Sequence, residues 1–270
     1  MGCDFSSSPS QRKPIVLAVG RLHRGAVQLE RLENFETLSV FSDFLKQGPP
    51  PGRSHCVAAF DLPFGLPRAF VAQMSWPQSW SECMDQFVSH SREELRQFFK
   101  AFCDARPVGA KFAHRATDIP AGSSPSMKWV NPPVAWMMHA GVPLLREAGW
   151  TFPQMHAGDP QRIALEAYPG LLARELVGHR SYKSDDKAKQ TPERWLARKD
   201  ILHGLDMAQS KLGLRLKLTA SQHDTLLADG SGDRLDAVLC MVQAAWAHLQ
   251  PNANYGLPEF DPLEGWIVSA

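Results

Sequence analysis

The 270-residue sequence has no long apolar run: a membrane-spanning helix needs about 20 consecutive apolar residues, and no segment approaches that length. The opening residues, MGCDFSSSPSQRK, also lack the apolar core of a secretory signal. We therefore expect a cytoplasmic protein without a membrane partner.

Paired cysteines and a strong net charge are also missing. The five cysteines lie at positions 3, 56, 83, 103 and 240, and no CxxC pair occurs. An odd, scattered set predicts reduced thiols and excludes a disulfide framework or a cysteine-rich zinc site. A net charge of +1 argues against a partner bound mainly by bulk charge, but allows a local basic groove. The sequence leaves the oligomeric state open.

The first thirty residues contain three short strand-like segments: 14–20, "PIVLAVG", is apolar and β-branched, and 25–30, "GAVQLE", alternates apolar with polar residues as half-buried strands do. Segments 1–5, 14–20 and 25–30 are predicted to form three antiparallel strands. Segment 37–47 has helical spacing and stops before Gly48-Pro49. Segment 56–61, "CVAAFD", is apolar almost throughout, which is typical of a central parallel strand.

The rest of the chain is predicted to complete one α/β domain over residues 1–270. A helical and loop insert at about 75–150 includes helical residues 79–106 and an irregular loop at 113–133. A further strand is expected at 162–170, with helices at 171–177, 193–212 and 231–249. The fold class is therefore a mixed five-stranded sheet, three antiparallel strands followed by parallel ones, flanked by helices.

Carboxylates stand at the ends of several of these elements. Asp4 ends the first strand, Asp61 ends "CVAAFD", and Glu166 lies in the strand "RIALEAYPG". Asp233 and Asp236 share one face of the first turn of the last helix. Ligands of open α/β sheets bind beyond the carboxyl ends of the strands, and clustered carboxylates require a cation or shared protons. Oxygen ligands favour Mg²⁺ or Mn²⁺, and two such ions can clamp a phosphodiester.

Each carboxylate also has a structural alternative. Asp61 before Pro63 could start a turn, and for Asp233 we prefer a helix N-cap. Asp236 suits the helix dipole in any case. Glu166 is costly inside an apolar strand unless it is paired, and an arginine is the alternative to a metal.

Six segments together resemble an uncharacterised family of predicted nucleases with a ribonuclease H-like fold: "GCDFSSS", "AAFDLPFGLP", "LEAYPG", "SYK", "DRLDAVLCMVQAAWA" and "EGWIV". The resemblance spans residues 1–268 and implies a β-β-β-α-β-α-β-α core with the 79–106 helices as an insertion. It implies that Asp4, Asp61, Glu166 and Asp236 are the motif carboxylates, catalytic and metal-binding, and that Tyr182-Lys183 is a motif without a known role. The implied activity is metal-dependent hydrolysis of DNA or RNA.

Basic residues are expected to bring the nucleic acid to these carboxylates. Residues 174–199 hold eight lysines and arginines against four acids, which suits a phosphate backbone or equally a solvated helix face. Lys183 is a candidate contact to a phosphate or the leaving oxygen, and the 113–133 loop offers His114, Arg115 and Lys128. Trp129 could stack on a base, but plain packing is the better interpretation.

Two other functions share parts of this pattern. Actin-like and sugar-kinase domains use the same core to bind ATP, but they place glycines beside the first aspartate to cradle phosphate, whereas Phe5-Ser6-Ser7-Ser8 follows Asp4 here. A non-catalytic nucleic-acid-binding module with structural carboxylates is the third possibility.

Overall fold

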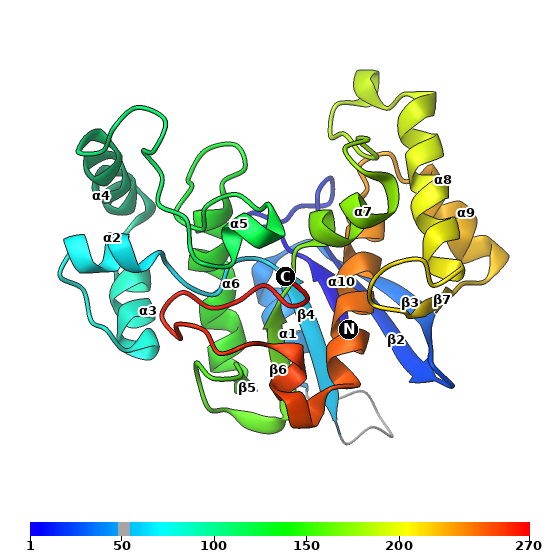
Figure 1. The fold of residues 1–270 in the computed structure, drawn as a ribbon, viewed down its shortest axis with the longest axis horizontal. Coiled ribbons are helices and arrows are strands. Elements are labelled where there is room, and N and C mark those ends of the chain that lie inside the picture. The colour runs from blue at the N-terminus through cyan, green and yellow to red at the C-terminus, as the bar shows by residue number, and fades with distance from the viewer. Residues whose placement is uncertain (48–54) are drawn as a thin grey trace.

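A computed structural model describes residues 1–47 and 55–270. Within these residues a seven-stranded sheet has the order β5-β6-β4-β1-β2-β3-β7 (Figure 1). The strands are β1 (Gly2–Asp4), β2 (Ile15–His23), β3 (Ala26–Phe35), β4 (Cys56–Asp61), β5 (Trp150–Thr151), β6 (Asp159–Glu166) and β7 (Arg215–Lys217).

The pairing confirms the predicted centre of the sheet. β1, β2 and β3 are antiparallel neighbours, and β4 runs parallel to β1 with β6 parallel to β4. The prediction of five strands missed β5 and β7 at the two edges. These strands have two and three residues, which is too short to show an alternating pattern.

Helices cover both faces of the sheet (Figure 1). They are α1 (Leu38–Lys46), α2 (Arg68–Gln73), α3 (Trp80–Ser89), α4 (Arg92–Asp104), α5 (Asp118–Ala121), α6 (Val134–Glu147), α7 (Pro169–Val177), α8 (Pro192–Asp206), α9 (Ala220–Ala228) and α10 (Asp233–His248), with short 3₁₀ turns at Lys187–Lys189 and Pro251–Gly256. The predicted helical region 79–106 is two helices, because Ser91 caps α4 with a capping box.

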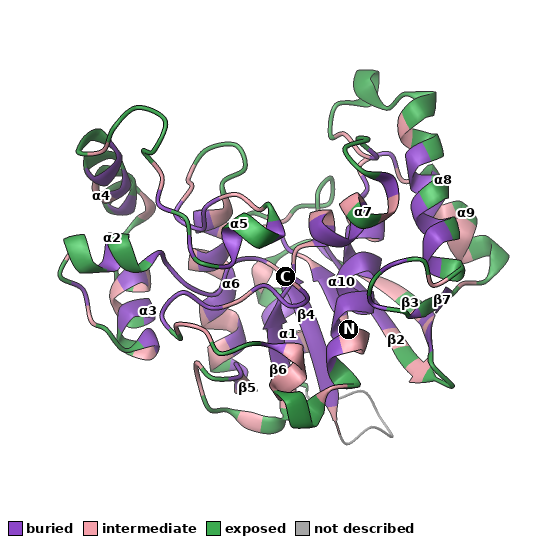
Figure 2. Cartoon of the chain, viewed as in Figure 1, coloured by how far each residue is buried: buried purple, intermediate pink, exposed green. Residues whose placement is uncertain are grey.

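Alternation along the strands assigns each side chain to one of two cores. The central strands and much of α10 are coloured as buried in Figure 2. Cys3, Ala58 and Phe60 pack on the face that carries α1, α3, α4 and α6. Val57 and Ala59 pack on the opposite face with residues of α10. Gly2 belongs to this second face, and a Cβ there would lie 1.9 Å from the backbone nitrogen of Met241, so β1 and α10 are in close backbone contact.

Several predicted boundaries shift in the structure. β6 ends at Glu166 instead of continuing to residue 170, and α8 ends at Asp206 instead of 212. Helices α2, α6 and α9 were not individually predicted, and α5 lies within the predicted 113–133 loop. No helix in the described ranges is long and apolar enough to cross a membrane.

Candidate metal centre

Asp4 and Asp61 face one another across the β1–β4 pair. They are register partners in the parallel ladder, each at the last residue of its strand. Asp4 lies two residues after Gly2, which contacts α10, and Asp61 lies two residues after Ala59, which also packs on that face. Because side chains alternate along a strand, both carboxylates are directed to the α10 side of the sheet.

The third carboxylate comes from the first turn of α10. Asp236 is fully buried, whereas Asp4 and Asp61 are partly exposed. One oxygen from each of the three side chains lies within 4.8 Å of the other two. The convergence of Asp4, Asp61 and Asp236, which we call the acidic triad, agrees with the sequence expectation for these three residues.

The groups bonded to the triad include one cation, Lys183, which does not balance the charge of three carboxylates. The Tyr182 hydroxyl donates to one oxygen of Asp236 at 2.5 Å, and the Lys183 ammonium donates to the other. If all three carboxylates are ionised, one ammonium group leaves two negative charges uncompensated.

The uncompensated negative charge contributes to raised pKa values for Asp4 and Asp61. Burial, with added repulsion from Asp236, raises the pKa of Asp61 to about 7, even though Lys183 lowers it. Burial and the charge of Asp236 also raise the pKa of Asp4 well above its usual range. For Lys183, burial acts to lower the pKa, but Asp236 and other acidic neighbours outweigh it and raise the pKa above its normal value.

The chemistry of the triad fits a divalent cation. All three donors are carboxylate oxygens close enough to share one ion, which matches the preference of Mg²⁺ and Mn²⁺ for oxygen ligands. The raised pKa values of Asp4 and Asp61 indicate that a cation would relieve a real electrostatic cost.

Glu166 lies outside the triad because of its position in β6. It is the register partner of Phe60, so its side chain is directed to the face opposite Asp61. Both of its oxygens accept hydrogen bonds from Arg115, at 2.6 and 2.8 Å, and one also accepts from the Phe64 amide at 2.9 Å. The arginine partner considered from the sequence is therefore present. The residue after β6, Ala167, packs instead on the α10 side.

Arg115 has no donor left for a phosphate. The guanidinium is 1% exposed, and its five N–H groups go to Asp118, Glu166 and the Glu264 carbonyl. The predicted substrate contact at Arg115 is thus a buried ion pair that fixes Glu166 and anchors the loop, because five donors are the full capacity of an arginine.

A cleft of about 860 Å³ opens above the carboxylates. Asp4 and Asp61 line it together with Lys183 and with Asn131 and Pro132, so the end of the 113–133 loop lies beside the carboxylates. His114 is exposed, Lys128 is half-buried, and neither lines the cleft. Lys183 does line the cleft and is also bonded to Asp236.

Some arginines of the basic segment 174–199 are engaged in contacts within the protein around Tyr182 and Lys183. Buried Arg198 donates to the Tyr182 carbonyl at 2.7 Å, and Arg194 donates to the Lys183 carbonyl. Arg180 pairs with Asp200 at 2.7 Å. Arg194 and Arg198 thus hold the backbone of Tyr182 and Lys183 in place, and binding of nucleic acid by the segment stays a prediction.

Of two further sequence interpretations, the one for Asp233 changes and the one for Trp129 does not. The N-cap of α10 is Gly232, with φ +79°, so Asp233 does not cap the helix; it lines the cleft and accepts from the Ser231 hydroxyl at 3.2 Å. Trp129 stacks on Phe99 with ring centroids 5.8 Å apart, which agrees with the packing interpretation.

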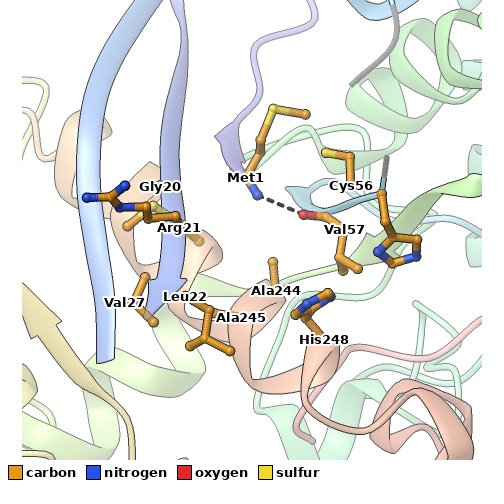
Figure 3. Close-up of a pocket in the computed structure, with 12 residues that line it drawn as sticks. Met1, Gly20, Arg21, Leu22, Val27, Cys56, Val57, Ala244, Ala245 and His248 are labelled. Carbon is orange, nitrogen blue, oxygen red and sulfur yellow. Dashed lines mark hydrogen bonds between the residues drawn. The ribbon is translucent and has the colours of Figure 1, made fainter. Parts of the chain in front are cut away.

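A smaller pocket of about 180 Å³ lies at the other ends of the same strands (Figure 3). Its walls include Met1, Val57 and His248, and the amino group of Met1 donates to the Val57 carbonyl at 2.7 Å. The described residues that line this pocket include no aspartate or glutamate, so it does not share the carboxylate chemistry of the cleft at the carboxyl ends of β1 and β4.

Comparison of the chain with protein-family models, with curated proteins and with solved structures found no match.

Proposed function

We propose that this protein is a metal-dependent nuclease that hydrolyses phosphodiester bonds of DNA or RNA with Mg²⁺ or Mn²⁺. The observation that carries the proposal is the convergence of carboxylate oxygens of Asp4, Asp61 and Asp236 within 4.8 Å of one another, beside an open cleft that Asp4 and Asp61 line. The strand order β3-β2-β1-β4-β6, with β1–β3 antiparallel, is the one expected of a ribonuclease H-like core and supports the same function.

The three aspartates would hold the metal. When bound there, divalent ions supply charge neutralisation for the phosphodiester and an activated water. Glu166 is not proposed as a ligand, because Arg115 and the Phe64 amide occupy both of its oxygens.

The remaining residues of the site hold the ligands in position. The Tyr182 hydroxyl and the Lys183 ammonium fix the two oxygens of Asp236, and Arg194 and Arg198 hold the backbone of Tyr182 and Lys183. Lys183 also lines the cleft, where its charge favours a phosphate. Such support is what places ligands accurately enough for catalysis.

Cleavage of end-labelled single- and double-stranded DNA and RNA tests the proposal, with Mg²⁺, Mn²⁺ or EDTA in the buffer. We expect metal-dependent cleavage by the wild type and a loss of at least 100-fold in Asp61→Asn and Asp236→Asn. The matched control is Asp224→Asn, since the Asp224 side chain is 81% exposed on α9 and should leave cleavage unchanged. Absence of cleavage of every substrate, or equal cleavage by wild type and Asp61→Asn, contradicts the proposal.

A further inference from the structure

The cleft above the triad has two chemically different walls. Pro132, Pro133, Val134 and Met137, from the end of the 113–133 loop and the start of α6, give one side an apolar surface. The other side, from α7 to residue 185, carries Arg174, Arg180 and Lys183. A ligand that fits both walls needs an apolar face on one side and negative charge on the other.

Arg174 is the cation on the second wall that the fold leaves open to a ligand. Arg180 and Lys183 are paired with Asp200 and Asp236, but in the described part of the chain Arg174 contacts no carboxylate. Its guanidinium lies over the Tyr168 ring at 5.2 Å and donates to the Tyr168 hydroxyl and the Ala121 carbonyl. These contacts hold the side chain in place without neutralising its charge.

Gly122, in the 113–133 loop, leaves room for the Arg174 side chain. Gly122 ends α5 with φ +60°, and a Cβ there would lie 2.9 Å from an Arg174 nitrogen. The position of the guanidinium is therefore set before a ligand arrives, which lowers the entropy cost of binding a phosphate.

The size and enclosure of the site favour a single strand over a duplex. Asp4 and Asp61 line the cleft together with the 131–134 segment, the 180–185 segment and the β1–β2 loop with Ser6, Ser7 and Lys13. A volume of about 860 Å³ lies in the range of small-molecule sites, roughly 300–1,000 Å³. A duplex keeps its bases stacked inside a rigid cylinder, whereas an unpaired nucleotide can turn its base onto a protein wall.

From these observations, and on the basis of the proposed nuclease function, we infer that the cleft binds unpaired nucleotides. The base lies against the Pro132–Met137 wall and a neighbouring phosphate binds Arg174. An apolar wall offers no hydrogen bonds to base edges, so binding is independent of base sequence. Single strands and strand overhangs are then the substrates, and a blunt duplex is a poor one.

Fluorescence anisotropy tests this inference without relying on cleavage. The probes are labelled 12-mers: a single strand, a blunt duplex and a duplex with an overhang, each measured with wild type in EDTA and in Ca²⁺. We expect the single strand and the overhang to bind at least tenfold more tightly than the blunt duplex. Arg174→Gln should weaken single-strand binding about tenfold and reduce the slope of log affinity against log salt by about one, because one phosphate contact is lost.

The variants separate this role from a structural one. Met137→Gln keeps the size of the side chain but makes the wall polar, and should weaken single-strand binding three- to tenfold. Arg174→Lys keeps the charge and should retain most of the salt slope even if Arg174→Gln folds poorly. Arg215→Gln, at an exposed arginine in β7, is the control and should change nothing.

Equal affinity for single strand and blunt duplex, or wild-type binding and salt slope in Arg174→Gln, overturns the inference. If that result accompanies metal-dependent cleavage, the nuclease function stands and the substrate assignment fails. If single strands bind as expected but no nucleic acid is cleaved, the nuclease function fails and the binding assignment stands.

Discussion

At the scale of single residues, the electrostatic cost of the acidic triad is the feature that a mutation can measure. Asp61 has a pKa of about 7, above its ordinary unfolded value of about 3.9. The folded protein therefore holds a proton more tightly than the unfolded chain between these two values. Stability is lost as the pH rises through this window, and the loss is complete above pH 7.

Asp61→Asn removes this cost in the metal-free protein. We expect the variant to match wild type near pH 4 and to exceed it by about 1 kcal/mol at pH 8, allowing for solvent screening of a partly exposed group. Urea unfolding in EDTA at both pH values measures the difference. A variant that is less stable than wild type at pH 8 would show that Asp61 has a structural partner instead of a repulsive neighbourhood.

The buried ion pairs of Arg115 behave in the opposite way. Arg115→Met leaves Asp118 and Glu166, which are 1% and 3% exposed, without their cation, and we expect a loss of about 3–5 kcal/mol in unfolding free energy. Arg68→Met removes an exposed pair with Asp261 and should cost less than about 1 kcal/mol by that interaction. Urea unfolding of both variants gives the comparison, and similar losses would contradict the structural role of Arg115.

At the scale of elements, the start of α10 links the helix to the site. Gly232 has φ +79°, and a Cβ there would lie 2.6 Å from the Cβ of Lys183. Gly213 has φ +64° with open space around it. Alanine at either position destabilises the fold by about 1 kcal/mol, because its Cβ disfavours a left-handed backbone. Only alanine at 232 also displaces Lys183.

We therefore expect Gly232→Ala to lower the unfolding free energy by at least 1 kcal/mol more than Gly213→Ala does. Gly232→Ala should also change the Mn²⁺-induced shift in melting temperature, whereas Gly213→Ala should leave that shift at the wild-type value. Thermal melts with EDTA and with Mn²⁺ provide both readings. Identical behaviour of the two variants would mean that Lys183 is free to move away from the helix start.

The helices and strands also show which parts of the fold and site can be predicted from the sequence alone. Continuous apolar runs and alternation were enough to predict β1–β4, β6 and α10, and hence Asp4, Asp61 and Asp236 at one end of the sheet. Glu166 was misplaced because the side to which it points depends on register: Phe60, and not Asp61, is its partner in β4. Side-chain partners that depend on tertiary contacts, such as those of Arg115 and Arg174, leave no periodic signal in the sequence.

At the scale of the whole molecule, the candidate metal site lies where three parts of the chain that are distant in sequence meet. Residues 4, 61 and 236 belong to β1, β4 and α10, so a metal that binds them binds only the folded protein and must stabilise it by mass action. Because protons compete for the same oxygens, the apparent affinity for metal should rise between pH 6 and pH 8, most steeply below the pKa of Asp61 at about 7. Melting temperatures at fixed Mn²⁺ over this pH range test the dependence, and a metal-induced shift that decreases with pH would contradict it.

The most direct test of the central claim is a calorimetric titration of the protein with Mn²⁺ at pH 7.5. The wild type is expected to bind at least one Mn²⁺ per chain, Asp61→Asn and Asp236→Asn at least tenfold more weakly, and Asp224→Asn like the wild type. Absence of binding by the wild type, or binding of equal strength in Asp61→Asn, would contradict a metal centre formed by Asp4, Asp61 and Asp236.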